Sequence, residues 1–222
     1  DATRKNASPF RGYEVKVKGL KASRAKFISL KNAANMAFAD EIARDGKGGW
    51  TDQGAVNDLS PFPVGRRIFG GVPFQIIDPA ENGGRSCVVV SGNRTLPFQP
   101  RSRSIEIGGR VKRLLFLHSG AWIAPDGGQV GKYEVRYASR KTWSIPVLEA
   151  VNITDRWGPS KKMKSAMCGW SGMNKSGVVG AFLYSWDNPH PEDQISSIVL
   201  KTKGNAVVGL LGLTAEKTEE SE

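Results

Sequence analysis

The sequence predicts an all-β protein, an antiparallel β-sandwich or barrel in which turns join the strands. Many segments alternate apolar and polar residues with a period of two, as strands with one buried face do. These segments are separated by clusters of Gly, Pro, Asn and Asp, and the chain contains 26 glycines and 12 prolines. Its 222 residues are enough to bury a full core in one large all-β domain or two small ones.

The clearest alternation lies at 13–18 and at 132–137. The second run is followed by a turn at 138–140 and by another alternating run at 142–147. Further strands are expected at 69–77, 86–90, 104–107, 113–118, 178–186, 195–201 and 206–213.

A few segments are expected to depart from this pattern. Two prolines in 61–67 remove donors that a central strand needs, so this segment is predicted to be a loop. Short helical turns are expected only at 21–25 and at 32–43, which is rich in small residues. Trp143 shares a face with the apolar residues of its strand and Trp186 ends an apolar strand, so both are expected in the core.

The net charge of +11 indicates an anionic partner: a nucleic acid, a membrane surface or an acidic polysaccharide. The alternative is that the charges are scattered over the surface and serve solubility. None of the common nucleic-acid-binding motifs is present, and no apolar run approaches the roughly 18 residues that span a bilayer. We therefore expect neither nucleic-acid binding nor membrane insertion. The chain begins at Asp1 without Met, which predicts a mature or excised chain.

Cys87 and Cys168 permit one disulfide at most. Each lies beside apolar residues, so we expect both to be free and buried, as small hydrophobic side chains. There is no Cys-x-x-Cys pair and no Cys/His cluster, and zinc binding is therefore not expected.

Residues 45–54 form the most distinctive segment, with four glycines, a tryptophan and several oxygen-bearing side chains. Glycines at this density predict a backbone that turns sharply. Asp45, Asp52 and Asp58 supply carboxylates along this loop, and Ca²⁺ binds about six to eight such hard oxygen ligands. The spacing is not that of an EF-hand. Two interpretations remain, a bound calcium ion and a purely structural loop packed over Trp50.

Sugar binding needs exposed aromatic faces together with planar hydrogen-bonding groups. Trp122 precedes a Gly/Pro loop and Trp157 lies within one, so these two are the best candidates for exposed rings among six tryptophans. Arg66, Arg67 and Arg156 lie in predicted loops and are candidates for bidentate capture of a sulfate or carboxylate. For Arg66 and Arg67 the alternative is packing along an apolar surface with the guanidinium in water.

Signs of catalysis are few. His118 closes an apolar run, which is more typical of a hydrogen-bonded core or rim histidine, and His190 lies between two prolines with no evident partner. Both remain candidates for polar contacts to a sugar. The chain has no Gly-x-Ser-x-Gly elbow, and nothing selects a pair of catalytic carboxylates. We therefore expect a protein that is not an enzyme, with a polysaccharide-degrading enzyme as an alternative.

Five segments carry a family resemblance. They are GKGGWTDQG at 46–54, FGGVPF at 69–74, IDP at 77–79, LFLHSGAW at 115–122 and WDNPHP at 186–191. In this order they resemble the galactose-binding-like β-sandwich domains appended to bacterial polysaccharide-degrading enzymes. The resemblance covers about 26–216, and it is the ordered set rather than any one segment that makes it specific.

The resemblance implies a jelly-roll β-sandwich that is secreted or periplasmic, with a structural calcium between an N-terminal loop and the last strand. In this chain such a calcium would join Asp45, Asp52 and Asp58 to Glu216. The chain departs from the family at 155–157, which reads Asp-Arg-Trp where such domains often have two adjacent aromatics. One stacking ring is thereby replaced by a cation.

The expected organisation is a linker or the end of a preceding segment at 1–25, a β-sandwich module at 26–216 and a charged tail at 217–222. The expected function is that of a non-catalytic carbohydrate-binding module. It would direct an appended catalytic domain to a polysaccharide, and the charge favours an anionic one, sulfated or uronate-bearing. A structural or docking domain of a multidomain glycoside hydrolase is the alternative.

Overall fold

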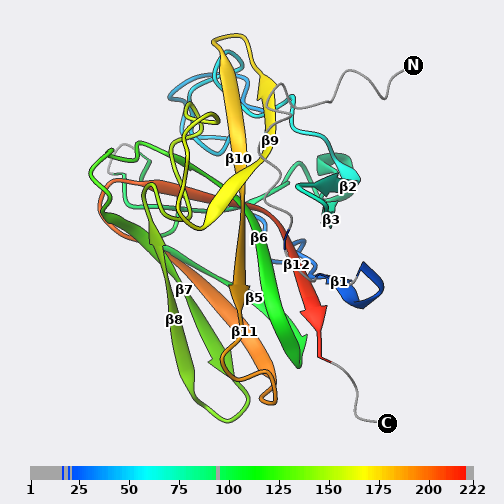
Figure 1. Ribbon diagram of the computed structural model, residues 1–222. Coiled ribbons are helices and arrows are strands. Elements are labelled where there is room, and N and C mark those ends of the chain that lie inside the picture. The colour runs from blue at the N-terminus through cyan, green and yellow to red at the C-terminus, as the bar shows by residue number, and fades with distance from the viewer. Residues whose placement is uncertain (1–16, 18–19, 21, 94–95, 219–222) are drawn as a thin grey trace.

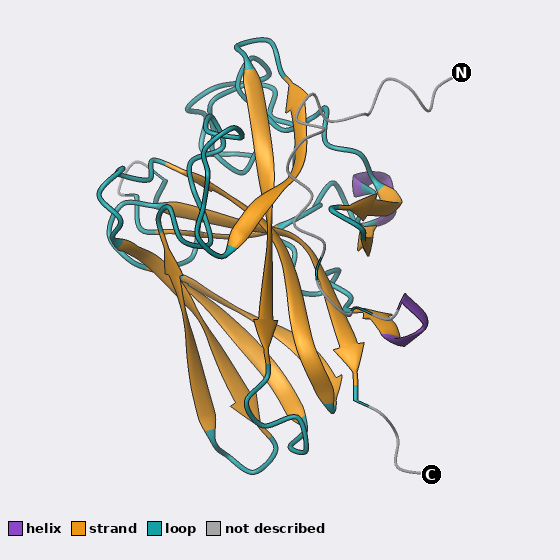
Figure 2. Ribbon diagram, in the orientation of Figure 1, coloured by secondary structure: helices purple, strands orange, loops and turns teal. Residues whose placement is uncertain are grey.

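The computed structural model of the chain describes residues 17, 20, 22–93 and 96–218. Nearly all of its regular structure is antiparallel strand, arranged in two sheets that pack against each other (Figures 1 and 2). The predicted antiparallel β-sandwich is therefore confirmed. No helix among the described residues is long and apolar enough to cross a membrane.

The strands follow one another with few helical interruptions. They are β1 (Ala25–Phe27), β2 (Gly65–Phe69), β3 (Val72–Ile76), β4 (Val88–Ser91), β5 (Ser102–Gly109), β6 (Val111–Ala121), β7 (Gln129–Tyr137), β8 (Thr142–Leu148), β9 (Ala166–Met173), β10 (Val178–Asp187), β11 (Ile195–Thr202) and β12 (Val207–Lys217). Two single-turn 3₁₀ helices, η2 (Ala22–Arg24) and η3 (Pro79–Glu81), complete the described elements.

The larger sheet has the order β1-β12-β6-β10-β9, and β4 also pairs with β12. β4 takes the first half of one edge of β12 and β1 takes its last residues, while β6 runs along the other edge. The second sheet has the order β5-β11-β7-β8, and β2 and β3 form a separate hairpin. Every one of these strand pairs is antiparallel.

Both faces of the larger sheet are covered. Leu114 and Phe116 of β6 belong to the hydrophobic cluster between the two sheets. Leu115 and Leu117 belong to a second cluster, which packs under the β2–β3 hairpin and the loops around Trp50. Because both faces of β6 are buried, its apolar run does not alternate.

Most expected strands are present with shifted ends, as β4 to β8 and β10 to β12. The expected run at 13–18 lies outside the described residues apart from Val17, which is not in a strand. The helical turn expected at 21–25 is η2. The segment 32–43 contains no helix, because the side chain of Asn35 hydrogen-bonds both the N–H (2.8 Å) and the carbonyl (3.0 Å) of Val89 and holds the segment against β4.

The single strand expected at 69–77 is a hairpin instead. β2 and β3 are joined by Gly70 and Gly71, which have φ of 55° and 79°. Positive φ at both central residues is the geometry of a type I′ hairpin turn. As a consequence Arg66 and Arg67 lie in β2, and the loop predicted to contain them ends before Gly65.

β9 was not expected from the pattern, because two glycines interrupt its side chains. A Cβ on Gly172 would lie 2.3 Å from the ring of Trp170, and a Cβ on Gly169 would lie 3.1 Å from Leu117. These glycines let large side chains fold over the strand, and so remove the alternation that predicts a strand.

Two expectations about single residue types have different outcomes. Trp186 is buried as predicted, but Trp143 is 42% exposed, so its predicted burial is wrong. Trp143 lies near the turn end of the edge strand β8, where its ring meets the edge of His190. Both cysteines are free as predicted, although only Cys87 is fully buried.

Candidate functional site

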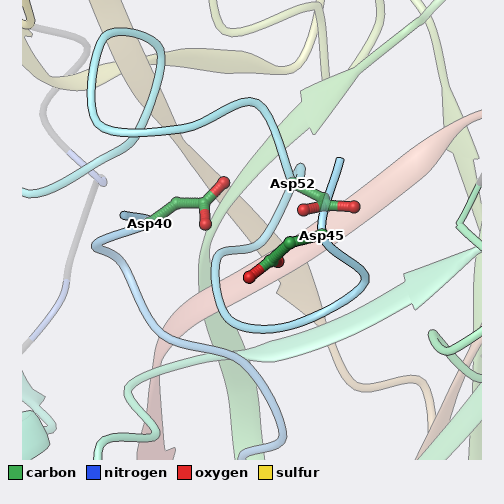
Figure 3. Close-up of side chains that lie close together, drawn as sticks. All are labelled: Asp40, Asp45 and Asp52. Carbon is green, nitrogen blue, oxygen red and sulfur yellow. The ribbon is translucent and has the colours of Figure 1, made fainter. Parts of the chain in front are cut away.

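The glycine-rich loop gathers three carboxylates, those of Asp40, Asp45 and Asp52 (Figure 3). One ligand oxygen from each lies within 4.8 Å of the others. Asp40 and Asp52 are buried, with 4% and 5% of their surface exposed, whereas Asp45 is exposed. We refer to these three residues as the aspartate cluster.

Backbone N–H groups hold the aspartate cluster in place. The N–H of Gly54 donates to Asp40 Oδ2 (2.6 Å), and the N–H of Gly46 donates to Asp52 Oδ2 (3.3 Å). The other oxygen of Asp52, Oδ1, is buried and has no hydrogen-bond partner among the described residues. A buried carboxylate oxygen without a protein partner is costly, so this atom is suited to accept a ligand.

The electrostatics of the aspartate cluster also favour a cation. Burial raises the pKa of Asp40, and the neighbouring carboxylates of Asp52 and Asp45 raise it further, while the hydrogen bond from Gly54 opposes the rise. A divalent cation would remove this repulsion. Carboxylate oxygens in a loop rich in backbone carbonyls match Ca²⁺, whose remaining ligands would be carbonyls and water. The residues present therefore fit a calcium ion.

Of the other expected ligands, Asp58 lies beside the aspartate cluster without joining it, and Glu216 lies elsewhere. Asp58 accepts hydrogen bonds from the N–H of Asp40 (3.1 Å) and from the backbone and hydroxyl of Ser60. Glu216 is fully buried in an ion pair with Arg113 Nε (2.9 Å) near the end of β12. The loop packs near the start of β12 instead, where Trp50 lies against Gly209. Glu216 lies seven residues further along the same strand, which is roughly 20 Å away.

Sequence reasoning missed Asp40. It precedes the glycine-rich run and carries no pattern of its own, but the chain folds back over it. Gly49 has φ of 52°, and a Cβ there would lie 2.5 Å from the Cβ of Asp40. The many glycines of the loop could have predicted that its backbone lies very close to another side chain, here that of Asp40.

Beside the aspartate cluster, three tryptophans surround the guanidinium of Arg156. Its central carbon lies 4.8 Å from the ring centre of Trp157, 5.3 Å from that of Trp50 and 5.9 Å from that of Trp122. Arg156 is 2% exposed and Trp50 is fully buried, whereas Trp122 and Trp157 are 39% and 42% exposed. We call these four residues the tryptophan–arginine cluster.

The segment around Asp155 positions this cluster at the end of β6. The Asp155 carboxylate accepts hydrogen bonds from the N–H of Ile123 (3.3 Å) and the N–H of Trp157 (3.2 Å). The N–H of Arg156 donates a hydrogen bond to the carbonyl of Gly120 in β6 (2.8 Å), and the carbonyl of Arg156 accepts one from the N–H of Gly180 in β10 (2.8 Å). These two bonds connect the segment to both strands. Trp122 follows β6 directly.

The positive charge of Arg156 is retained inside the protein. Burial lowers the pKa of Arg156 to about 10, and the nearby carboxylate of Asp155 opposes this shift. The guanidinium Nη2 donates to Gln53 Oε1, whereas Nε is buried without a partner among the described residues. Since the pKa stays well above neutrality, the guanidinium is charged at pH 7. Its bond to Gln53 connects it to the loop of the aspartate cluster.

The other predicted sugar contacts are not brought to this cluster. Arg66 and Arg67 are exposed on β2, with the Arg66 guanidinium 5.6 Å above the ring of Phe27. His190 follows Asn188, which is bonded to Val111 at the start of β6, so His190 lies at the opposite end of β6 from Trp122.

His118 is fully buried in the core between the sheets. Its Nδ1 lies 3.0 Å from the Tyr133 hydroxyl and its Nε2 lies 2.8 Å from the carbonyl oxygen of Asn152. Burial lowers the pKa of His118 to about 4, although the Asn152 carbonyl opposes the shift. The ring is therefore neutral at pH 7 and out of reach of a surface ligand. This agrees with the expectation of a hydrogen-bonded core histidine.

Comparison with known proteins does not assign this site to a family. No protein-family model matches the chain, and no curated protein matches it in sequence.

Proposed function

We propose that this chain is a non-catalytic carbohydrate-binding module whose binding surface is the tryptophan–arginine cluster. The observation that carries the proposal is the pair of half-exposed rings, Trp122 and Trp157, held against one buried guanidinium. Exposed aromatic rings that are grouped together are typical of interaction surfaces, and indole faces suit the C–H side of a sugar ring.

Arg156 supports this surface from below. Since it is almost fully buried, it cannot clasp a sulfate or carboxylate in the bidentate manner expected from the sequence. Its charge still acts on the surface through the rings, and the net charge of +11 adds to the same field. Both favour a polysaccharide with sulfate or uronate groups over a neutral one.

The finer assignment follows the resemblance to galactose-binding-like domains. Under it the sandwich is a jelly roll, the protein is secreted or periplasmic, and the module directs an appended catalytic domain to its polysaccharide. The β-sandwich architecture supports this assignment, since such modules share it.

The test is binding of the full chain to an array of sulfated, uronate-bearing and neutral polysaccharides at two salt concentrations. We expect binding to an anionic class that weakens as salt screens the charges. Salt-insensitive binding to a neutral glycan would retain the module and reject its anionic preference. Absence of binding across the array would reject the proposed function.

A further inference from the structure

The aspartate cluster and the tryptophan–arginine cluster are built on one loop. Trp50 and Gln53, which both contact Arg156, flank Asp52 in the sequence. Gln53 lies between two tethered residues, because Asp52 belongs to the aspartate cluster and the N–H of Gly54 is bonded to Asp40. The position of the Gln53 side chain therefore depends on how the aspartates are held.

Backbone N–H groups hold the three aspartates, but no positive side chain among the described residues neutralises their charges. No lysine or arginine in the described part of the chain forms an ion pair with Asp40, Asp45 or Asp52. Two of the three carboxylates are buried, and Asp52 Oδ1 has no partner there. Like charges at this separation repel, and a bound cation would neutralise them. This orphaned oxygen points to a ligand independently of the clustering of acidic groups.

We propose that Ca²⁺ binds at Asp40, Asp45 and Asp52, and that its binding is coupled to ligand binding at the tryptophan–arginine cluster. The ion holds the loop in the form that places Gln53 and Trp50 against Arg156, and Arg156 in turn supports the exposed rings of Trp122 and Trp157. The coupling to a glycan rests on the proposed function. Such coupling is reciprocal, so the glycan must tighten Ca²⁺ binding by the same factor as Ca²⁺ tightens glycan binding.

The first experiment measures the ion alone, by calorimetric titration of the full chain with Ca²⁺ and by melting in Ca²⁺ and in EDTA. We expect one ion per chain and a higher melting temperature in Ca²⁺, because a ligand of the native state stabilises it. Asp45→Asn, at an exposed member of the cluster, should weaken Ca²⁺ binding at least ten-fold without preventing folding.

The matched control is Glu41→Gln, which removes an exposed negative charge from the same loop but outside the cluster. It should change the Ca²⁺ affinity less than two-fold. No heat of binding together with identical melting in Ca²⁺ and EDTA would overturn the cation site. If both variants lost Ca²⁺ affinity equally, the loss would come from the lower negative charge of the loop and not from a removed ligand. That result would overturn the assigned ligands.

The second experiment measures the coupling without any glycan, by amide hydrogen exchange with and without Ca²⁺. We expect Ca²⁺ to slow exchange in 50–54 and also in 155–158, and Gln53→Ala should abolish the second effect while retaining Ca²⁺ binding. Calcium binding with unchanged exchange at 155–158 would overturn the coupling.

The third measurement applies where the array finds a glycan. We expect Ca²⁺ to tighten glycan binding at least five-fold in the unmodified chain and less than two-fold in Gln53→Ala. Equal glycan affinity in Ca²⁺ and in EDTA would overturn the coupling and leave the binding function standing. If the array is silent, the proposed function fails, and hydrogen exchange still decides the coupling on its own.

Discussion

Arg156 is an almost fully buried cation, and its surroundings show how the charge is kept there. Three indole rings face the guanidinium, and a ring face attracts a cation through its negative electrostatic potential. The carboxylate of Asp155 opposes the effect of burial on the pKa of Arg156. A buried charge is tolerated only with such partners, so Arg156 orders the rings around it rather than facing the solvent.

The role of Trp157 can be separated from that of an exposed tryptophan in general. Trp157→Ala should weaken binding of the polysaccharide identified by the array at least ten-fold, about 1.4 kcal/mol, because it removes a stacking face. Trp143→Ala is the matched control, since Trp143 has the same exposed fraction, 42%, but lies on β8. Affinity electrophoresis of the two variants measures the difference. An equal effect of both substitutions would place the binding surface elsewhere.

The buried ring of His118 gives a pH dependence of defined sign. Its pKa is about 4 in the folded chain, below the usual value of 6.5, so the unfolded chain binds the proton more tightly between these values. The neutral ring contributes its full stabilisation above pH 6.5. As the pH falls from 6.5 toward 4, the free energy of unfolding should decrease by ~3 kcal/mol. NMR titration should show the ring resonances of His118 unchanged from pH 7 to pH 5. A midpoint near 6.5 would contradict the closed environment of the ring.

At the scale of the element, the loop of the aspartate cluster depends on glycines for two separate reasons. Gly46 has φ of 74° and open space where a Cβ would be, so it is needed only for its backbone conformation. Gly49 has φ of 52° and also lies against Asp40, where a Cβ would come within 2.5 Å. The two positions therefore separate the cost of left-handed backbone from the cost of a steric clash.

Gly49→Ala should destabilise the chain more than Gly46→Ala. We expect about 1 kcal/mol for Gly46→Ala, from backbone strain alone, and ~3 kcal/mol for Gly49→Ala, which must also displace Asp40. Urea unfolding of both variants in the presence of EDTA measures the free energies without a contribution from bound metal. Equal losses would show that the loop can move away from Asp40 at no cost.

The elements that the sequence predicts are those whose strands have one buried face. β7, for example, alternates buried and more exposed residues, and its run at 132–137 was readable for that reason. β9 was not, because Gly169 and Gly172 interrupt its pattern to accommodate neighbouring side chains. The β2–β3 hairpin was hidden because β2 carries two arginines directly after a proline-containing loop, and because its two-glycine turn was read as part of a single strand with β3.

The candidate site was predictable only in its local part. Trp122 and Trp157 were expected to be exposed because they lie in turn-rich segments, and the structure places both at the surface. The burial of Arg156 depends on Gln53, 103 residues away in the sequence, and on the rings of Trp50 and Trp122 from two other segments. Contacts of this kind are set by the packing of the sheets, and no local pattern reports them.

At the scale of the whole molecule, two hydrophobic clusters share one sheet. The first lies between the two sheets, and the second lies between the larger sheet and the β2–β3 hairpin with its loops. Strands β6, β10 and β12 contribute residues to both clusters. Neither cluster can lose its packing without exposing one face of the same strands, so the two should unfold together rather than as separate units.

Neighbouring residues of β6 allow this to be tested. Leu114 belongs to the first cluster and Leu115 to the second, and both are fully buried. Leu114→Ala and Leu115→Ala should each cost about 2–5 kcal/mol, from lost burial and the cavity left behind. In urea, the far-ultraviolet signal of the sheets and the tryptophan fluorescence should shift together in both variants. Trp50 and Trp170 of the second cluster contribute to the fluorescence together with the other four tryptophans. If Leu115→Ala moved part of the fluorescence transition and left the sheet signal in place, the clusters would be independent. The loop that carries the aspartates would then be able to open without unfolding the sandwich.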